Sequence, residues 1–149
     1  MIALIQRVSQ CSVAVGGETI SSIGHGMLIL LGVHRDDTGR DLALLVRKCA
    51  GLRIFPDGGG KMNLAAAECA AEALVVSQFT LLGDVRKGMR PYFGDAAEPD
   101  RANALYEAFI GALAETGIPV RGGAFGASMQ VSLINDGPVT IRIDTRELA

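Results

Sequence analysis

Short apolar runs and strict alternation of apolar with polar residues predict most of the strands. Residues 2–8 and 11–15 are expected to be extended, with the two glycines at 16–17 forming a hairpin turn after them. The uninterrupted apolar runs 27–31 and 73–76 are typical of short strands that are buried in a sheet. These segments indicate a core rich in β-structure.

Two further segments repeat apolar residues at helical spacing. The first follows Thr38, a residue type that commonly caps helix N-termini, and its apolar positions are Leu42, Leu45, Val46 and Cys49. The second is expected to begin near Pro99 and to end before Gly117, because proline suits the first turn of a helix and glycine suits its C-terminal cap. The alanine-rich stretch 64–72 is compatible with a short helix or with an irregular loop.

Alternation returns near the C-terminus, over residues 129–133 and 139–143. Residues 135–138, which read Asn-Asp-Gly-Pro, are expected to form a hairpin turn between these two strands. The order of strands, helix, strand, helix and strands predicts a mixed α/β domain and argues against a doubly wound nucleotide-binding fold. No repeat or long linker divides the chain, so residues 1–149 are expected to form one domain.

The composition is that of a folded domain, because 49% of the 149 residues are hydrophobic and 20% are charged. The net charge of -2 excludes a globally basic nucleic-acid-binding protein but not a local basic patch. The sequence has no run of about 18 apolar residues, so no membrane span is predicted. Residues 1–9 lack the layout of a signal peptide, and the expected location is the cytoplasm.

Candidate metal ligands and general bases are scarce. The three cysteines, Cys11, Cys49 and Cys69, stand far apart and form no CxxC pair, which argues against a disulfide framework and against a zinc site. We therefore expect no metal and no cofactor. Only two histidines, His25 and His34, are present, and neither is close in sequence to a candidate nucleophile.

The first candidate for chemistry is Ser77-Gln78-Phe79-Thr80-Leu81, where an apolar strand ends in polar residues. This segment is either an ordinary strand end or a pocket floor, in which backbone N–H groups and Gln78 donate to an oxyanion while Thr80 binds the substrate. A serine or threonine nucleophile would need a neighbouring base, and the sequence has no G-x-S-x-G motif. A hydrolase of this sequence is therefore expected to bring little acid–base machinery of its own.

Two other segments are candidates for contact with a ligand. Gly137 precedes a proline, so this peptide bond has an optional cis form, and the missing side chain lets another molecule approach the backbone closely. The basic residues Arg86, Lys87 and Arg90 form either a solvated loop or a phosphate-binding patch, with Lys61 as a candidate extension.

Residues 77–81 and 135–140 together resemble the two signature motifs of the D-aminoacyl-tRNA deacylases, which are editing enzymes of the bacterial type. The likeness runs along nearly the whole chain and includes the segments 6–8, 30–33, 52–55, 60–63, 86–88, 90–91, 105–106 and 125–127. The resemblance implies an α/β fold in which β-sheets form a barrel-like core flanked by helices. It also implies a cytoplasmic homodimer that hydrolyses the ester of D-aminoacyl-tRNA, spares L-aminoacyl-tRNA and clears glycine from tRNA(Ala).

The resemblance further implies roles for individual residues. The residues that correspond to the catalytic pocket are Ser77, Gln78, Phe79 and Thr80. Gly137 and Pro138, joined by a cis peptide bond, are expected to reach into the pocket of the dimer partner and to act there as a chirality filter. Met129 is expected to contact the substrate. Charge, and not the resemblance, selects the expected tRNA-binding residues: because a chain of net charge -2 needs a local basic surface to bind acidic tRNA, they are Arg7, Lys61, Arg86, Lys87 and Arg90.

The missing histidine base points to hydrolysis that the RNA assists. An aminoacyl ester is already activated, and the neighbouring 2′-hydroxyl of the terminal ribose can help to activate water while the Phe79 N–H and Gln78 stabilise the oxyanion. Two alternatives stay open. One is a catalytically silent relative that binds tRNA or another partner through the same pocket, and the other is an ordinary esterase with Ser77 or Thr80 as its nucleophile.

Overall fold

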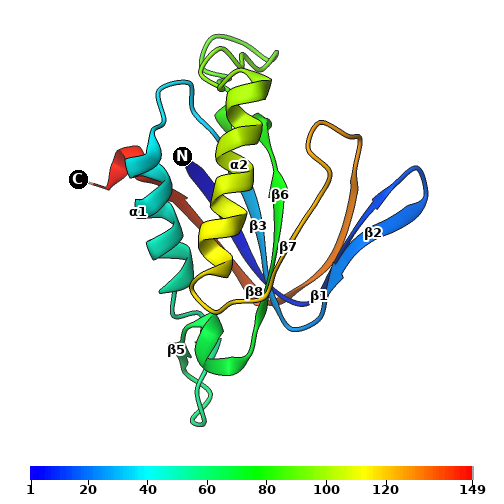
Figure 1. The fold of residues 1–149 in the computed structure, drawn as a ribbon, viewed down its shortest axis with the longest axis vertical. Helices are drawn as coiled ribbons and strands as arrows, with labels where there is room; N and C mark the ends of the chain where they lie inside the picture. Colours follow the sequence, from blue (N-terminus) through cyan, green and yellow to red (C-terminus); the bar gives the residue numbers. More distant parts are fainter. Residues whose placement is uncertain (149) are drawn as a thin grey trace.

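Two helices cover one side of a strongly curved sheet in the computed structural model, which describes residues 1–148 (Figure 1). The central strand is β1 (Ile2–Val15). It pairs antiparallel with β3 (Gly26–Gly32) along its first half and with β2 (Glu18–Ile23) along its second half. On its other edge it pairs antiparallel with β8 (Gln130–Asp144), from one end of β1 almost to the other.

The strands expected at 2–8 and 11–15 are one continuous strand in the structure. Between Val8 and Cys11, β1 changes its partner from β3 to β2. β8 pairs with β1 residues before and after this change, which keeps the backbone of β1 extended. The predicted hairpin turn is confirmed. Its glycines, Gly16 with φ +57 and Gly17 with φ +84, have the positive φ values that a tight two-residue turn requires.

The remaining strands extend the sheet and flank it. β6 (Glu72–Ser77) lies parallel to β3, and β7 (Val120–Gly122) lies parallel to β6, so the six-stranded sheet is mixed. β4 (Phe55–Pro56) and β5 (Met62–Leu64) form a separate two-stranded hairpin. The sequence pattern does not predict β7, because three residues are too few for alternation to show.

Both predicted helices are present. α1 (Gly39–Ala50) starts with a capping box in which the Thr38 hydroxyl and the Asp41 carboxylate each accept a backbone N–H of the first turn. α2 (Pro99–Ala114) has its proline in the first turn, and the chain makes one more turn to Gly117, which has φ +92. The alanine-rich stretch contains the short 3-10 helix η1 (Ala66–Cys69). No helix within residues 1–148 is both long and apolar enough to cross a membrane.

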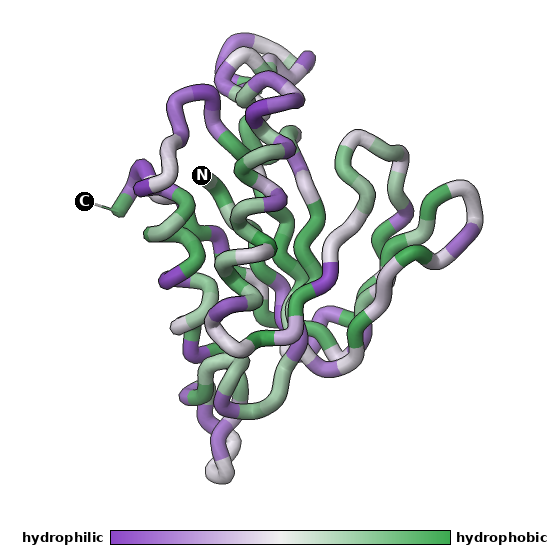
Figure 2. Tube along the Cα trace, viewed as in Figure 1, coloured by the Kyte–Doolittle hydropathy of each residue, from purple (hydrophilic) through white to green (hydrophobic). Residues whose placement is uncertain are grey.

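The sheet separates two clusters of buried apolar side chains. On the side of the helices, Ile5 of β1 and Ile29 of β3 belong to the same cluster as Phe109 of α2. A second cluster lies where the far ends of β1, β2 and β8 curve over the sheet, and it contains Val8, Cys11, Val13, Ile23, Leu28, Leu74 and Val76. Hydrophobic residues follow these strands in Figure 2, and the predicted mixed α/β fold with a barrel-like core is confirmed.

Residues 135–138 do not form the predicted hairpin turn. They lie inside β8, which pairs Asn135 with Val8 and Thr140 with Gln6, so β8 has a bulge opposite this short part of β1. Both halves of β8 continue in one direction because β1 offers a partner on either side of the bulge. The Gly137–Pro138 peptide bond within the bulge is cis, as expected.

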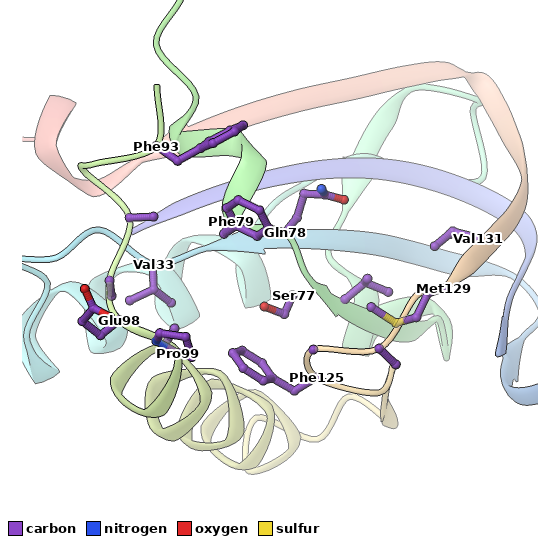
Figure 3. A pocket seen from close by; sticks show the side chains of 16 residues that line it. Val33, Ser77, Gln78, Phe79, Phe93, Glu98, Pro99, Phe125, Met129 and Val131 are labelled. Carbon is purple, nitrogen blue, oxygen red and sulfur yellow. The ribbon is translucent and has the colours of Figure 1, made fainter. Parts of the chain in front are cut away.

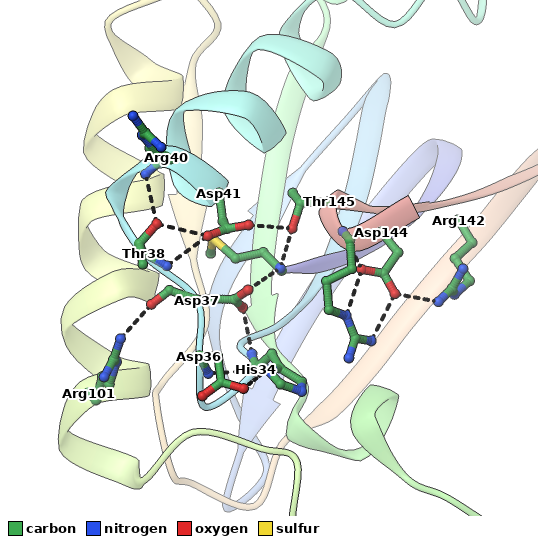
Figure 4. Close-up of polar contacts among 12 residues, drawn as sticks. His34, Asp36, Asp37, Thr38, Arg40, Asp41, Arg101, Arg142, Asp144 and Thr145 are labelled. Carbon is green, nitrogen blue, oxygen red and sulfur yellow. Dashed lines mark hydrogen bonds and ion pairs between the residues drawn. The ribbon is translucent and has the colours of Figure 1, made fainter. Parts of the chain in front are cut away.

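The amino terminus is buried in a polar cluster that links the start of α1 to the end of the chain (Figure 4). The Met1 ammonium donates to Asp37 Oδ1 and to Thr145 Oγ1, each at 2.6 Å. The second carboxylate oxygen of Asp37 accepts the His34 N–H at 2.6 Å, and the Thr145 hydroxyl donates to Asp41 at 3.0 Å. Buried donors therefore engage both oxygens of Asp37.

Candidate active site

A cavity of about 580 Å³ opens where β6 ends, between the start of α2 and the loop formed by residues 123–129 (Figure 3). Most of its lining is apolar, and the larger apolar side chains are Val33, Val76, Phe79, Phe93, Phe125, Met129 and Val131. A concave, mainly apolar site with a few polar groups is the usual form of a small-molecule pocket. This cavity is therefore the candidate active site.

The floor of the cavity consists of the end of β6 and the start of the 3-10 helix η2 (Phe79–Leu82). Ser77 pairs with Leu31 of β3, and the Gln78 N–H donates to the Leu31 carbonyl at 2.8 Å. Phe79 begins η2, so its N–H has no partner inside that helix. The sheet thus holds a backbone N–H donor at a fixed place in the floor.

The side chains of Gln78 and Thr80 contact each other beside the cavity. The Gln78 amide donates to the Thr80 hydroxyl. In Figure 3 the Gln78 side chain points away from Ser77, whose hydroxyl points into the cavity. Of the four residues expected in the catalytic pocket, Ser77, Gln78 and Phe79 line the cavity, and Thr80 lies outside its lining.

An aromatic pair stands at the mouth of the cavity. The rings of Phe79 and Phe93 meet edge to face with their centroids 5.1 Å apart. Phe79 is 55% exposed, which is unusual for so large an apolar side chain. The exposed ring adjoins the loop formed by residues 84–95, so a ligand that leaves the cavity at this side meets that loop next.

Another wall of the cavity is the loop 123–129, which Tyr106 of α2 holds in place. The buried Tyr106 hydroxyl donates to the Val75 carbonyl at 2.9 Å and accepts the Gly123 N–H at 3.0 Å. Burial raises the pKa of this phenol, which keeps it protonated as a donor. Met129, expected to contact the substrate, lines this wall.

Ionisable side chains are scarce around the cavity. Glu98 carries the single ionisable group among the lining residues. Neither histidine lines the cavity, because His25 packs against Phe55 with a centroid separation of 5.2 Å and His34 Nδ1 accepts a backbone N–H at 3.1 Å. A hydroxyl nucleophile at Ser77 therefore has no imidazole base at hand, which disfavours a conventional esterase mechanism.

Gly137 and Pro138 do not line the cavity of their own chain. They lie in the β8 bulge beside Arg7, whose guanidinium donates to the carbonyls of Asp136 at 3.0 Å and Ile54 at 2.6 Å. The Arg7 side chain is only 12% exposed, so it secures the bulge and presents no free cation for a phosphate. A role for the Gly137–Pro138 segment at a pocket would require the pocket of a second copy.

The basic residues expected to contact tRNA do not form one patch. Arg86, Lys87 and Arg90 border a second cavity of about 520 Å³. Hydrogen bonds from Arg86 hold the pKa of the Asp84 carboxyl at about 2. Lys61 lies on the β4–β5 hairpin, at the opposite end of the molecule in Figure 1, so it does not extend the cluster.

The lining residues that the sequence analysis did not name as candidates include Phe93, Glu98 and Phe125. Phe125 lies in one of the segments that carry the family resemblance, which is a signal that could have found it. Phe93 and Glu98 precede α2 in an irregular segment without periodicity, so only the folded chain shows that they face the cavity.

Residues 4–144 match the family described as D-Tyr-tRNA(Tyr) deacylase. Relatives named D-aminoacyl-tRNA deacylase include one from Anaeromyxobacter dehalogenans, 59% identical over 99% of both chains. Another, from Geobacter sulfurreducens, is 53% identical over 98% of this chain and 96% of its own length.

Two solved structures share the fold. One, described as c-Myc DNA Unwinding Element Binding Protein, has a TM-score of 0.92 and 44% identity, covering 97% of this chain and 98% of that one. The other, a probable eukaryotic D-amino acid tRNA deacylase, has a TM-score of 0.78 and 21% identity, covering 95% of this chain and 97% of that one. Because the family match and these identities extend over nearly the whole chain, the chain belongs to the D-Tyr-tRNA(Tyr) deacylase family.

Proposed function

We propose that the chain hydrolyses the ester between a D-amino acid and the terminal ribose of tRNA, releasing the free amino acid and the tRNA. The observation that carries this proposal is the mainly apolar cavity at the end of β6, which is lined by Phe79, the residue whose N–H starts η2, and by no histidine. An activated ester suits such a site, because a single oxyanion donor is worth about 2.7–4 kcal/mol. The names of the relatives support the substrate class.

In the proposed mechanism, water adds to the ester carbonyl and the 2′-hydroxyl of the ribose helps to activate that water. The Phe79 N–H and the Gln78 amide stabilise the oxyanion. Gln78 has two side-chain N–H groups and gives one to the Thr80 hydroxyl, which leaves the other for the substrate. Thr80 then orients Gln78 and takes no covalent part.

The mechanism is tested with Thr80→Ala. We expect the variant to hydrolyse D-tyrosyl-tRNA more slowly than the wild type and yet to remain active, because Thr80 acts only through Gln78. Complete loss of activity in a folded variant, together with an acyl group trapped on Thr80 of the wild type, would show a covalent mechanism instead.

Discrimination between enantiomers is proposed to come from the Gly137–Pro138 segment of the partner in a homodimer. Gly137 has φ +134, a conformation that favours glycine, and the Arg7 guanidinium secures the bulge through the neighbouring Asp136 carbonyl. Backbone carbonyls of this segment would hold the α-ammonium and the Cα–H of the substrate. A D side chain then points to open space, whereas an L side chain meets the wall.

The proposed filter excludes by steric clash, so glycine should pass it. The decisive assay is therefore deacylation of D-tyrosyl-tRNA, L-tyrosyl-tRNA and glycyl-tRNA(Ala) by the same preparation. We expect cleavage of the first and third substrates and sparing of the second. Comparable rates on the two tyrosine enantiomers would refute the filter, and a fully active monomer in sedimentation would refute the contribution of the partner.

The same preparation distinguishes the two alternatives. An ordinary esterase would hydrolyse simple esters and lose activity to fluorophosphonates, whereas the proposed enzyme should do neither. A silent relative would bind tRNA and release no amino acid from D-tyrosyl-tRNA. A charged tRNA as substrate also favours a cytoplasmic location, which cell fractionation tests.

A further inference from the structure

We propose that the loop 84–95 is a docking surface for the single-stranded 3′ end of the RNA, in which Lys87 and Arg90 bind backbone phosphates and Tyr92 stacks on a base. This inference rests on the proposed function, because it assumes that the ester occupies the neighbouring cavity. It excludes Arg86 and Lys61 from the docking surface.

The charges around the second cavity leave two cations free. Of its two carboxylates, Asp84 forms an ion pair with Arg86 at 2.6 Å, and Asp95 faces Arg35 at 3.5 Å. Lys87 and Arg90 border the same cavity, and within residues 1–148 no carboxylate lies at ion-pair distance from either one. Unmatched cations of this kind suit an anionic ligand such as a phosphate.

Arg86 stabilises the loop through contacts with Asp84. Its guanidinium makes hydrogen bonds of 2.9 and 2.6 Å to Asp84, and its backbone N–H donates to the same carboxylate at 2.9 Å. Asp84 in turn exchanges two backbone hydrogen bonds with Tyr92, at 2.8 and 2.9 Å. These contacts close the loop at its base, so Lys87 and Arg90 project from an anchored segment.

The far end of the loop is anchored to the segment that follows β3. The Arg35 N–H donates to the Asp95 carbonyl at 2.8 Å, and the Ala97 N–H donates to the Val33 carbonyl at 2.9 Å. Val33 also lines the first cavity. The position of the loop relative to the candidate active site is therefore fixed by backbone contacts.

The docking surface is continuous with the first cavity. Tyr92 borders the second cavity, and the next residue, Phe93, lines the first cavity and packs on Phe79. Tyr92 is 63% exposed and Phe79 is 55% exposed, although both are aromatic. Exposed aromatic rings beside free cations are the recurring arrangement for binding single-stranded nucleic acid, where bases stack and phosphates pair. A duplex presents no unstacked bases, so the single-stranded 3′ end fits this surface better.

The test compares two substrates that carry the same ester. D-tyrosyl-tRNA has the upstream phosphates and bases, whereas the D-tyrosyl ester of adenosine lacks them. For Lys87→Ala/Arg90→Ala we expect the ratio of kcat/KM on the tRNA to kcat/KM on the adenosine ester to fall at least tenfold. The charge-matched control is Arg47→Ala/Lys48→Ala in the last turn of α1, whose ratio should match the wild type.

Salt dependence gives a second readout. Each phosphate contact to a single strand contributes about 0.7 to the slope of log affinity against log salt, so the Lys87/Arg90 double variant should lose about 1.4 of that slope. Tyr92→Leu should lower kcat/KM on the tRNA about tenfold, while Tyr92→Phe should retain it, because stacking needs the ring and not the hydroxyl.

Binding of uncharged tRNA separates this proposal from the proposed function. Removing the single-stranded 3′ end from the tRNA should weaken its binding to the wild type more than its binding to the Lys87/Arg90 double variant, which keeps only the cavity and Tyr92 as contacts for that end. The proposal is overturned if the double variant keeps the wild-type substrate ratio, loses activity equally on both esters, or loses as much affinity as the wild type when the 3′ end is removed. If the wild type hydrolyses neither ester, the proposed function fails, and this binding comparison still decides the docking surface.

Discussion

The buried contact between the Met1 ammonium and Asp37 makes Asp37→Asn a strongly destabilising change. The ammonium is 0% exposed, the carboxylate is 2% exposed, and the two groups are 2.6 Å apart. The amide of asparagine has nearly the shape of the carboxylate but has no charge and only one acceptor oxygen. Because Met1 uses one oxygen of Asp37 and the His34 N–H uses the other, one buried donor must lose its partner.

The expected loss follows from the burial of the pair. Removing one partner of a buried ion pair costs about 3–5 kcal/mol, since the remaining charge stays desolvated. The Thr145 hydroxyl still accepts from the ammonium, which places the expected loss near the lower value, about 3 kcal/mol. For a domain of this size, that loss lowers the melting temperature by about 6–12 °C.

Urea unfolding at one fixed protein concentration measures this loss, and the fixed concentration matters because any self-association would add to the apparent stability. The control is Asp36→Asn, which makes the same chemical change one residue away on a side chain that is 77% exposed. The control should change the unfolding free energy by no more than about 0.5 kcal/mol. A loss below about 1 kcal/mol for Asp37→Asn, or one equal to the control, would refute a buried ion pair at the amino terminus.

Two further predictions concern the cavity wall and pH. Tyr106→Phe keeps the ring but removes the hydroxyl that bridges Val75 and Gly123. Steady-state kinetics on D-tyrosyl-tRNA should therefore show KM rising more than kcat falls. A pure loss of kcat would contradict the role of Tyr106 in positioning the loop 123–129. Burial raises the pKa of the Cys49 thiol from 9.0 to about 12, so the folded state resists deprotonation and loses stability as pH rises from 9 towards 12. Urea unfolding at several pH values should show a flatter decline for Cys49→Ala, and an unchanged decline would rule out this thiol as a cause.

Local interactions made part of the fold predictable from the sequence. The Thr38 cap with Asp41, the paired glycines at 16–17 and the apolar runs at 27–31 and 73–76 act within a few residues, and the structure has the elements they predict. The floor of the candidate site was predictable in the same way. The apolar run 73–76 forms β6, and the polar residues Ser77 and Gln78 at the end of this strand line the cavity.

Residues 135–138 show where local reasoning fails. Asparagine, aspartate, glycine and proline in succession favour a turn, yet the chain keeps its direction because β1 supplies pairing partners on both sides of them. The same long-range pairing joins 2–8 with 11–15 into one strand. Strand length and strand direction were set by a partner more than a hundred residues away, which no window of sequence contains.

The sequence by itself determined the local elements, the polar strand end at Ser77 and the family resemblance. Only the tertiary structure decided which charges are free and which are already paired. Arg7 and Arg86 look like Lys87 and Arg90 in the sequence, but the fold gives the first two internal acceptors and gives the last two no carboxylate partner within the described residues. The physical reason is that the availability of a charged side chain for a ligand depends on the groups within a few ångströms of it, and the packing of distant segments sets those neighbours.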